Sequence, residues 1–141
     1  MAVRVRLRIK GTGREVVTST LINSGFEAEE PQLVIPLSLA KALGLTSAEA
    51  SIEDFSTAGG GRISGYRAEN PAEVELVLDD KPSIKTFAYV TILPGETEAI
   101  MSDRLASELN ITILDLWRGY WCLQDELGTK QRASVLPEEW K

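Results

Sequence analysis

The residues whose types and order could do chemistry lie at a single turn, Asn23-Ser24-Gly25. A β-branched run, 15–22, leads into this turn and is typical of a strand. Small polar residues at the end of such a run form turns, so the simplest interpretation of the tripeptide is a turn that ends a strand. The chemistry available there depends on what a carboxamide does at position 23.

The absence of histidine from the sequence excludes Ser-His-Asp, Cys-His and His-ligated metal mechanisms. Ser24 therefore lacks the base that a serine nucleophile needs, and Lys41 is expected on a helix surface. Cys122 is the single cysteine, so no intramolecular disulfide can form. Between Trp121 and Leu123, it is expected to be a small buried apolar residue.

Three other polar groupings have structural interpretations that we favour. Glu27, Glu29 and Glu30 could bind a hard cation through oxygen, but a solvated acidic loop is the simpler expectation. Asp79-Asp80 is typical of a turn. The glycine run 59–61 does not lead from a strand into a helix, so it does not indicate a phosphate-binding loop. We expect neither a cofactor nor a metal ion.

Hydrophobic periodicity predicts one mostly-β domain with two short helices. One helix is opened by Pro36 and ended by Gly44, and the other covers 103–109 with Ser102 as its N-cap. Glycine or acidic turns separate most of the strands. The expected strands cover 3–10, 15–22, 52–57, 62–66, 73–78, 83–93, 111–116 and 120–124.

The formal net charge of −6 argues against a general nucleic-acid binder. Four basic residues near the start alternate with apolar ones, which is typical of the wet face of a two-sided strand. No apolar run approaches the length of a membrane span. We therefore expect a soluble, cytoplasmic protein that binds neither nucleic acid nor membrane.

Three segments resemble the retropepsin-like aspartic proteases. Leu21-Ile22-Asn23-Ser24-Gly25 is similar to their active-site motif, hydrophobic-hydrophobic-Asp-Ser/Thr-Gly. Ala99-Ile100-Met101-Ser102 and the helix after it resemble the second loop of the family. Ile111-Thr112-Ile113 and Gly119-Tyr120-Trp121 resemble the terminal hairpin of some members. The resemblance covers residues 14–124, and it rests on the order of short motifs.

This resemblance implies half of a closed acid-protease β-barrel, in a domain spanning 1–124. In such enzymes two carboxylates share a proton and activate a water that attacks a peptide bond. One chain supplies one loop, so the resemblance implies a homodimer in which residue 23 faces its own copy, with Ser24 and Gly25 holding the two loops together. Ala58, Gly59, Gly60 and Gly61 would form the tip of a flap over a peptide or protein substrate. The tail, 125–141, is a candidate for packing at the dimer interface.

The sequence departs from the family pattern at residue 23, because Asn cannot take a proton from water near neutral pH. The chain as written is therefore expected to be inactive. Three interpretations remain: an engineered Asp→Asn change, a natural pseudo-protease that only binds peptides, or a plain turn without this ancestry. Two further departures are Ser102 in place of the family's Gly, and an acidic loop, 26–32, that could select basic substrates.

A weak internal repeat has a meaning within this resemblance. Each of two segments contains a β-branched strand, a turn and a helix with the pattern Leu-Ala-x-x-Leu. The first runs from Ser19 to Ser47 and the second from Val90 to Ile113. The family fold is built on such an approximate repeat.

Overall fold

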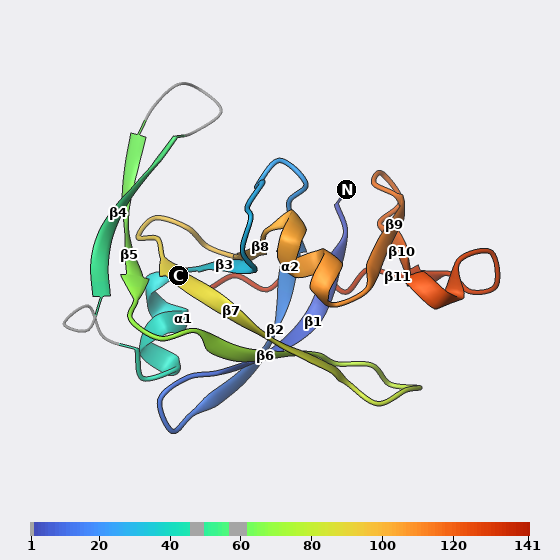
Figure 1. Ribbon diagram of the computed structural model, residues 1–141, viewed down its shortest axis with the longest axis horizontal. Helices are drawn as coiled ribbons and strands as arrows, with labels where there is room; N and C mark the ends of the chain where they lie inside the picture. Colours follow the sequence, from blue (N-terminus) through green and yellow to red (C-terminus); the bar gives the residue numbers. More distant parts are fainter. Residues whose placement is uncertain (1, 46–49, 57–61) are drawn as a thin grey trace.

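The computed structural model describes residues 2–45, 50–56 and 62–141, and it is mostly β, with two short α-helices in the described part of the chain. The predicted flap tip, Ala58–Gly61, lies outside the described residues. Figure 1 shows a barrel, a long hairpin on one side of it and a small sheet on the other. The larger sheet has eight strands. They are β1 (Arg4–Lys10), β2 (Glu15–Ile22), β3 (Gln32–Ile35), β4 (Ala50–Ser56), β5 (Arg62–Ala68), β6 (Ala72–Leu76), β7 (Ile84–Ile92) and β8 (Ala99–Met101).

Six of these strands close into a barrel. Their order is β3-β8-β2-β1-β6-β7, and an additional parallel pairing of β3 with β7 completes the ring. The interior is apolar because alternate residues of each strand face inward; on β1 these are Val5, Leu7 and Ile9, all buried. The predicted mostly-β domain is confirmed.

A tight turn connects β1 to β2 and approaches the first helix. A Cβ added at Gly11 would lie 2.1 Å from the carbonyl oxygen of Leu43, so only glycine fits there. The Thr12 N–H donates to the same Leu43 oxygen at 3.0 Å. The turn therefore fixes the end of α1 (Leu37–Ala42) against the barrel.

Two segments of the chain have matching structures and interlock at the centre of the barrel. The first is β2, its loop, β3 and α1; the second is β7, its loop, β8 and α2 (Asp103–Glu108). Each segment's first strand runs parallel to the other segment's second strand, and β3 and β8 pair antiparallel between them. The internal repeat in the sequence therefore has a structural counterpart.

Backbone hydrogen bonds follow the same repeat. The N–H of the residue after β2, Asn23, donates to the Met101 carbonyl at 3.2 Å, and the N–H of the residue after β7, Leu93, donates to the Ile35 carbonyl at 2.9 Å. Asn23 and Leu93 thus occupy equivalent positions, one polar and one apolar.

The hairpin of β4 and β5 extends away from the barrel, to the left in Figure 1. It joins the sheet through two residues of β5, Tyr66 and Arg67, which pair with Ile92 and Thr91 of β7. The seven paired positions of β4 and β5 confirm the predicted hairpin on either side of the glycine run.

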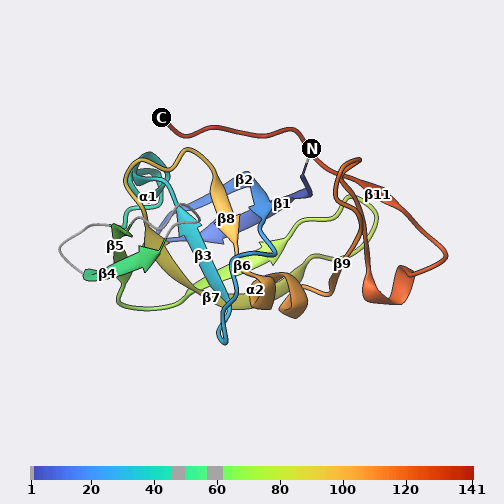
Figure 2. The ribbon, with the colours of Figure 1, turned by 90° about the horizontal axis from the view of Figure 1, so that it is seen from above.

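The second sheet contains β9 (Ile111–Asp115), β10 (Tyr120–Leu123) and β11 (Arg132–Ala133), in the order β11-β10-β9, with the 3-10 helix η2 (Gln124–Glu126) between β10 and β11. Beyond β11 the tail crosses the barrel of its own chain, as Figure 2 shows. Val135 donates to the Arg4 carbonyl at 3.0 Å, and Trp140 donates to the Thr97 carbonyl at 2.7 Å. Packing of the tail at a dimer interface stays a prediction.

Both predicted helices form, and Cys122 is buried as expected. Trp121 is also buried, whereas Trp117 is 71% exposed. None of the helices that the structure describes has the length and apolar character needed to cross a bilayer.

Candidate functional site

The turn Asn23-Ser24-Gly25 lies where β2 leaves the centre of the barrel. The Asn23 N–H is the last donor of this strand to β8, and the Asn23 carbonyl accepts from the Phe26 N–H at 3.0 Å. This second bond closes a β-turn over residues 23–26, in which Asn is a favoured first residue. β2 therefore ends in a turn at residues 23–26, and the predicted turn is confirmed.

The Asn23 side chain is exposed and folds back on its own turn. Its Oδ1 accepts the Gly25 N–H at 3.0 Å, the geometry of an Asx-turn. Ser24 and Gly25 are exposed as well. A carboxylate at position 23 has the same shape and can accept the same bond, so the turn does not require the amide.

Gly25 has less steric reason to be glycine than its counterpart after β7. Its φ does not lie in the left-handed region, and a Cβ added there would meet only the Asn23 Oδ1 at 3.2 Å within the chain. The equivalent residue Gly95 has a φ of +96° and needs glycine for that reason.

The acidic loop that follows is held by polar contacts from α2. The Asp103 N–H donates to the Phe26 carbonyl, and Asp103 Oδ1 accepts the Ala28 N–H, both at 3.0 Å. Arg104 donates to the Glu29 carbonyl at 3.2 Å. These bonds fix the loop and leave the Glu27 and Glu29 residues exposed.

A second anchor ties the same loop to the base of the β4–β5 hairpin. The Arg67 Nη2 lies 3.2 Å from a Glu30 carboxylate oxygen, and the Arg67 guanidinium stacks 4.5 Å from the centre of the Tyr89 ring. The acidic loop thus bridges α2 and the strand that carries the hairpin.

Ser102 joins the two interlocked segments. It is fully buried, and its Oγ accepts the Leu105 N–H at 3.2 Å, which caps α2. The same Oγ accepts the Gln32 N–H from β3 at 3.1 Å. The predicted N-cap is confirmed, and its second bond gives a physical reason for Ser where the resembled family has Gly.

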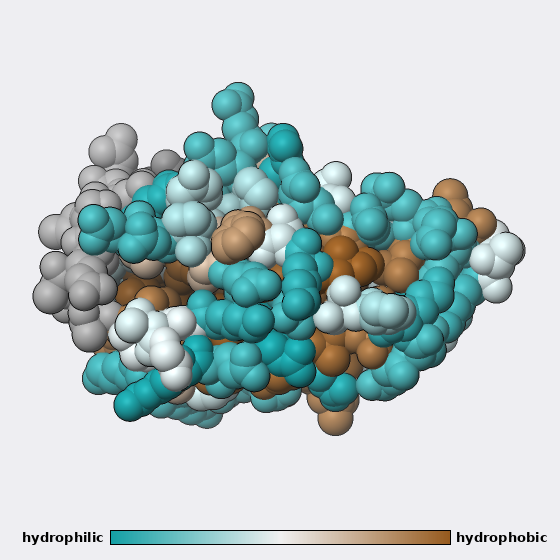
Figure 3. Space-filling view, turned by 60° about the horizontal axis from the view of Figure 1, so that its bottom comes forward, coloured by the Kyte–Doolittle hydropathy of each residue, from teal (hydrophilic) through white to brown (hydrophobic). Residues whose placement is uncertain are grey.

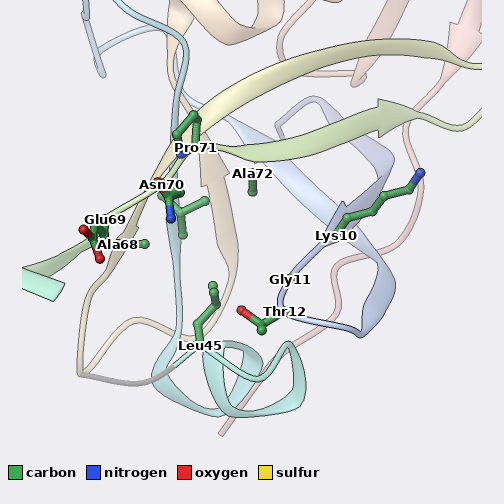
Figure 4. Close-up of a pocket in the computed structure, with 10 residues that line it drawn as sticks. Lys10, Gly11, Thr12, Leu45, Ala68, Glu69, Asn70, Pro71 and Ala72 are labelled. Carbon is green, nitrogen blue, oxygen red and sulfur yellow. The ribbon is translucent and has the colours of Figure 1, made fainter. Parts of the chain in front are cut away.

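Two hollows on the surface are lined by described residues that lie away from the turn. One of about 170 Å³ lies between the β1–β2 turn, the end of α1 and the β5–β6 connection (Figure 4). Lys10 points away from it in Figure 4, because its Nζ pairs with Glu73 and Glu75 at 3.3 Å each. No converging charges mark this hollow as a binding site.

Another hollow, of about 460 Å³, is mostly apolar and lies between the β6–β7 hairpin and the end of β10; Leu78, Ile84 and Leu123 contribute to its lining. Apolar residues show through a largely hydrophilic face on this side of the molecule in Figure 3. Within the described ranges, no group of three or more His, Cys, Asp or Glu residues is arranged to hold a metal ion.

The structure therefore brings together the predicted turn, the acidic loop and Ser102 at one end of the interlocked segments. The fourth predicted feature, the flap tip at 58–61, lies outside the described residues. Sequence reasoning did not anticipate the Arg67–Glu30 anchor, since nothing in the local pattern links positions 37 residues apart.

Neither a protein-family model nor a curated protein matches the chain.

Proposed function

We propose that this protein is a homodimeric aspartic endopeptidase of the retropepsin-like type, with residue 23 of each copy at the catalytic position. The observation that carries the proposal is the placement of an exposed Asn-Ser-Gly turn at the end of a central strand, where two equivalent segments interlock in a closed barrel. The chain as written lacks the acid itself.

The chemistry of the proposed site requires a pair of carboxylates. Two such groups close together cannot both ionise easily, so one stays protonated as acid while the other activates water. The second segment of the chain cannot supply the partner, because Leu93 occupies the position equivalent to Asn23. A second copy would supply the facing residue 23, which becomes a carboxylate in Asn23→Asp, and this is why the proposal includes a homodimer.

Substrate would bind as an extended strand. Arg67 ties the base of the β4–β5 hairpin to Glu30 of the acidic loop, so both elements would border the same peptide. Main-chain hydrogen bonds would give affinity, and pockets for alternate side chains would give selectivity.

A second candidate function is peptide binding without cleavage. It is favoured by Asn23 itself, since a carboxamide has no general-base function and its Oδ1 is already used by the Gly25 N–H. A lost general base alone lowers a rate on the order of 10²–10⁴-fold, and a symmetric dimer would lose both catalytic groups.

The substitution Asn23→Asp separates the two candidates. It preserves side-chain shape and the bond from Gly25, so we expect the fold to be retained. If the first candidate is right, the variant gains cleavage of an unfolded protein, with an acid optimum and sensitivity to pepstatin. Asn70→Asp is the matched control, because Asn70 is also an exposed asparagine in a bend, away from the site.

Absence of cleavage by Asn23→Asp over pH 3–8, in a preparation shown to be dimeric, would contradict the enzymatic proposal. Binding of extended peptides by that same preparation would then favour the second candidate. Equal activity in the Asn70→Asp control would point to a contaminating protease. The intact masses of the parent chain and of this control check that Asn23 has not deamidated in either of them.

A further inference from the structure

The turn at residues 23–26 holds a side-chain amide next to a backbone nitrogen that can attack it. Asn23 is followed by Ser24, whose small side chain leaves its backbone nitrogen open to approach, and both residues are exposed. Among the described residues, nothing accepts a hydrogen bond from the Ser24 N–H or from the Asn23 Nδ2. In that part of the chain, the attacking and the leaving nitrogen of a ring closure are therefore both unengaged.

The Asn23 side chain is folded over the main chain in the way that such a ring closure needs. Its Oδ1 accepts the Gly25 N–H at 3.0 Å, and the ring that this bond closes includes Asn23 Cγ and the Ser24 nitrogen. A cyclic imide formed between these two atoms uses only atoms of that ring. The fold thus keeps the reacting atoms in one small turn, which lowers the entropy cost of bringing them together.

The Gly25 N–H can also stabilise the charge that develops during the attack. When a nitrogen adds to an amide carbonyl, negative charge builds up on the carbonyl oxygen, which here is the Asn23 Oδ1. A backbone N–H already directed at this oxygen stabilises that charge, as in an oxyanion hole. An acid at position 23 keeps the same donor, and a hydrogen bond to an ionised oxygen is stronger than one to an amide oxygen.

The other two asparagines of the sequence lack this arrangement. Asn70 precedes Pro71, whose nitrogen carries no hydrogen and cannot form the imide. Asn110 has a φ of 61° and precedes Ile111, a buried β-branched residue at the start of β9 that crowds its own nitrogen. Both are exposed, as Asn23 is, so exposure alone does not distinguish Asn23.

We propose that Asn23 is a self-modification site, at which the chain converts its own amide into a carboxylate after synthesis. The Ser24 nitrogen bonds to Asn23 Cγ, and its proton passes through water to Nδ2, which departs as ammonia. Water then adds its hydroxyl to Cγ of the imide and its proton to the Ser24 nitrogen, and the bond between these two atoms breaks. The main chain is restored with Asp at position 23, and the net change is one water consumed and one ammonia released.

The fold favours Asp over the alternative product. The Asn23 N–H donates to Met101, and the Asn23 carbonyl accepts from Phe26, so the original path of the backbone is held on both sides. Opening of the imide at Cγ preserves these bonds. Opening at the main-chain carbonyl gives isoaspartate, whose extra backbone carbon disrupts them. This inference rests on the proposed function, because it names the source of the acid that the catalytic position lacks.

Peptide mapping by mass spectrometry tests the proposal on the full chain, sampled during incubation at 37 °C and neutral pH. Asn23 should become Asp while Asn70 and Asn110 stay unchanged, and in water labelled with ¹⁸O the new carboxylate should carry one labelled oxygen. The conversion should be at least about 10-fold faster in the folded chain than in the peptide 18–30, below the roughly 10²–10³-fold effect of an enclosed oxyanion donor.

Two substitutions at Ser24 isolate the attacking nitrogen. Ser24→Pro removes its N–H, and proline is favoured at the second position of a β-turn, so the turn should form while the conversion is lost. Ser24→Ala is the matched control, because it keeps the N–H and should convert at close to the rate of the parent chain. Circular dichroism checks that both variants are folded.

The proposal is overturned if Asn23 stays an amide in the aged chain, or if isoaspartate is the only product. It is also overturned if the folded chain converts no faster than the peptide, or if Ser24→Pro converts as fast as Ser24→Ala. The comparison of folded chain and peptide needs no variant, so the proposal can fail even where Ser24→Pro does not fold.

The outcome is separable from that of the catalytic proposal, because conversion is read from mass and not from activity. Conversion at position 23, with no cleavage by Asn23→Asp, would support this site and contradict the enzyme. Cleavage by Asn23→Asp, with a parent chain that keeps its amide, would do the reverse. If both proposals hold, the activity of the ageing parent should rise as the square of the converted fraction, since both copies must carry the acid.

Discussion

Glu75 is a carboxylate that lies almost fully buried among cations on the flank of the barrel. It is 4% exposed, and its oxygens lie 2.8 Å from Arg8, 3.3 Å from Lys10 and 3.6 Å from Lys85. Burial raises the pKa of Glu75, but hydrogen bonds from Lys10, Arg8 and Ser83 outweigh it and lower the pKa to about 2. The charged form is therefore the one that the fold stabilises.

This lowered pKa predicts how stability depends on pH. Because the folded pKa lies below the ordinary value of about 4.5, the contribution of Glu75 is fully present above that pH and is lost as pH falls toward 2. Urea unfolding should show Glu75→Gln less stable than the parent at pH 7, with the difference shrinking below pH 4.5. Glu108→Gln removes an exposed i,i+4 pair with Arg104 and should change little. A difference that stays constant down to pH 2 would contradict this assignment.

A second ionic cluster shows what a single sequence conceals at the residue scale. Asp80 was expected to do no more than form a turn. Its carboxylate contacts Lys130 and Arg132, and Arg132 also binds the buried Glu126 at 2.7 Å. These contacts lower the pKa of both acids, with the Arg132 hydrogen bond as the largest cause. No local pattern connects a hairpin turn to a strand 52 residues later.

At the scale of the elements, Ser102 makes two hydrogen bonds, one that caps α2 and one that links the helix to β3. Ser102→Ala removes both the helix cap and the acceptor of the Gln32 N–H, and it leaves that part-buried N–H without this partner. We expect a loss of about 2 kcal/mol in the free energy of unfolding. Ser107→Ala on the exposed side of the same helix is the control and should change stability by less than about 0.5 kcal/mol. If chemical denaturation gives the same free energy of unfolding for Ser102→Ala and Ser107→Ala, the two hydrogen bonds of Ser102 do not stabilise the fold.

The elements also show where sequence reasoning succeeds. Elements with a clear hydrophobic period and local end signals are predicted nearly to the residue: the strand expected at 15–22 is the observed β2, and the helix expected at 103–109 contains α2. Both β3 and β8 were missed as strands. Each is short, three or four residues, and each is defined by pairing with distant strands, which local periodicity does not encode. The predicted turn at 23–25 was found because its signal is local, and barrel closure was expected only from the family resemblance.

At the scale of the whole molecule, the C-terminal tail lies across the barrel and ends in Trp140, which packs against the core. Trp140 is half-buried against the core, and its Nε1 donates to the Thr18 Oγ1 at 3.0 Å. Farther back, Glu138 and Ser19 exchange hydrogen bonds of 2.8 and 3.3 Å. These contacts explain why Thr18 and Ser19 are fully buried although they are polar.

Removing the Trp140 side chain should destabilise the whole domain. We expect Trp140→Ala to lower the free energy of unfolding by about 2–3 kcal/mol, somewhat less than for a fully buried tryptophan. Leu136→Ala is the control from the same tail, since Leu136 is 83% exposed and should matter little. Thermal unfolding of both variants provides the comparison, and identical midpoints would mean that the tail lies on the barrel without stabilising it.

The interlocking of the two segments has a consequence for how the chain must fold. β3 lies between β7 and β8, and β8 lies between β2 and β3, so neither half can complete its sheet before the other half has been synthesised and brought in. The parallel ladders join Thr20 to Ala99 and Gln32 to Tyr89. These pairings require long loops to close, and the entropy cost of closure precedes the stabilising contacts. Refolding should therefore be slow for a chain of this size, in the range of milliseconds to seconds. The central strands should be the last part of the barrel to gain protection.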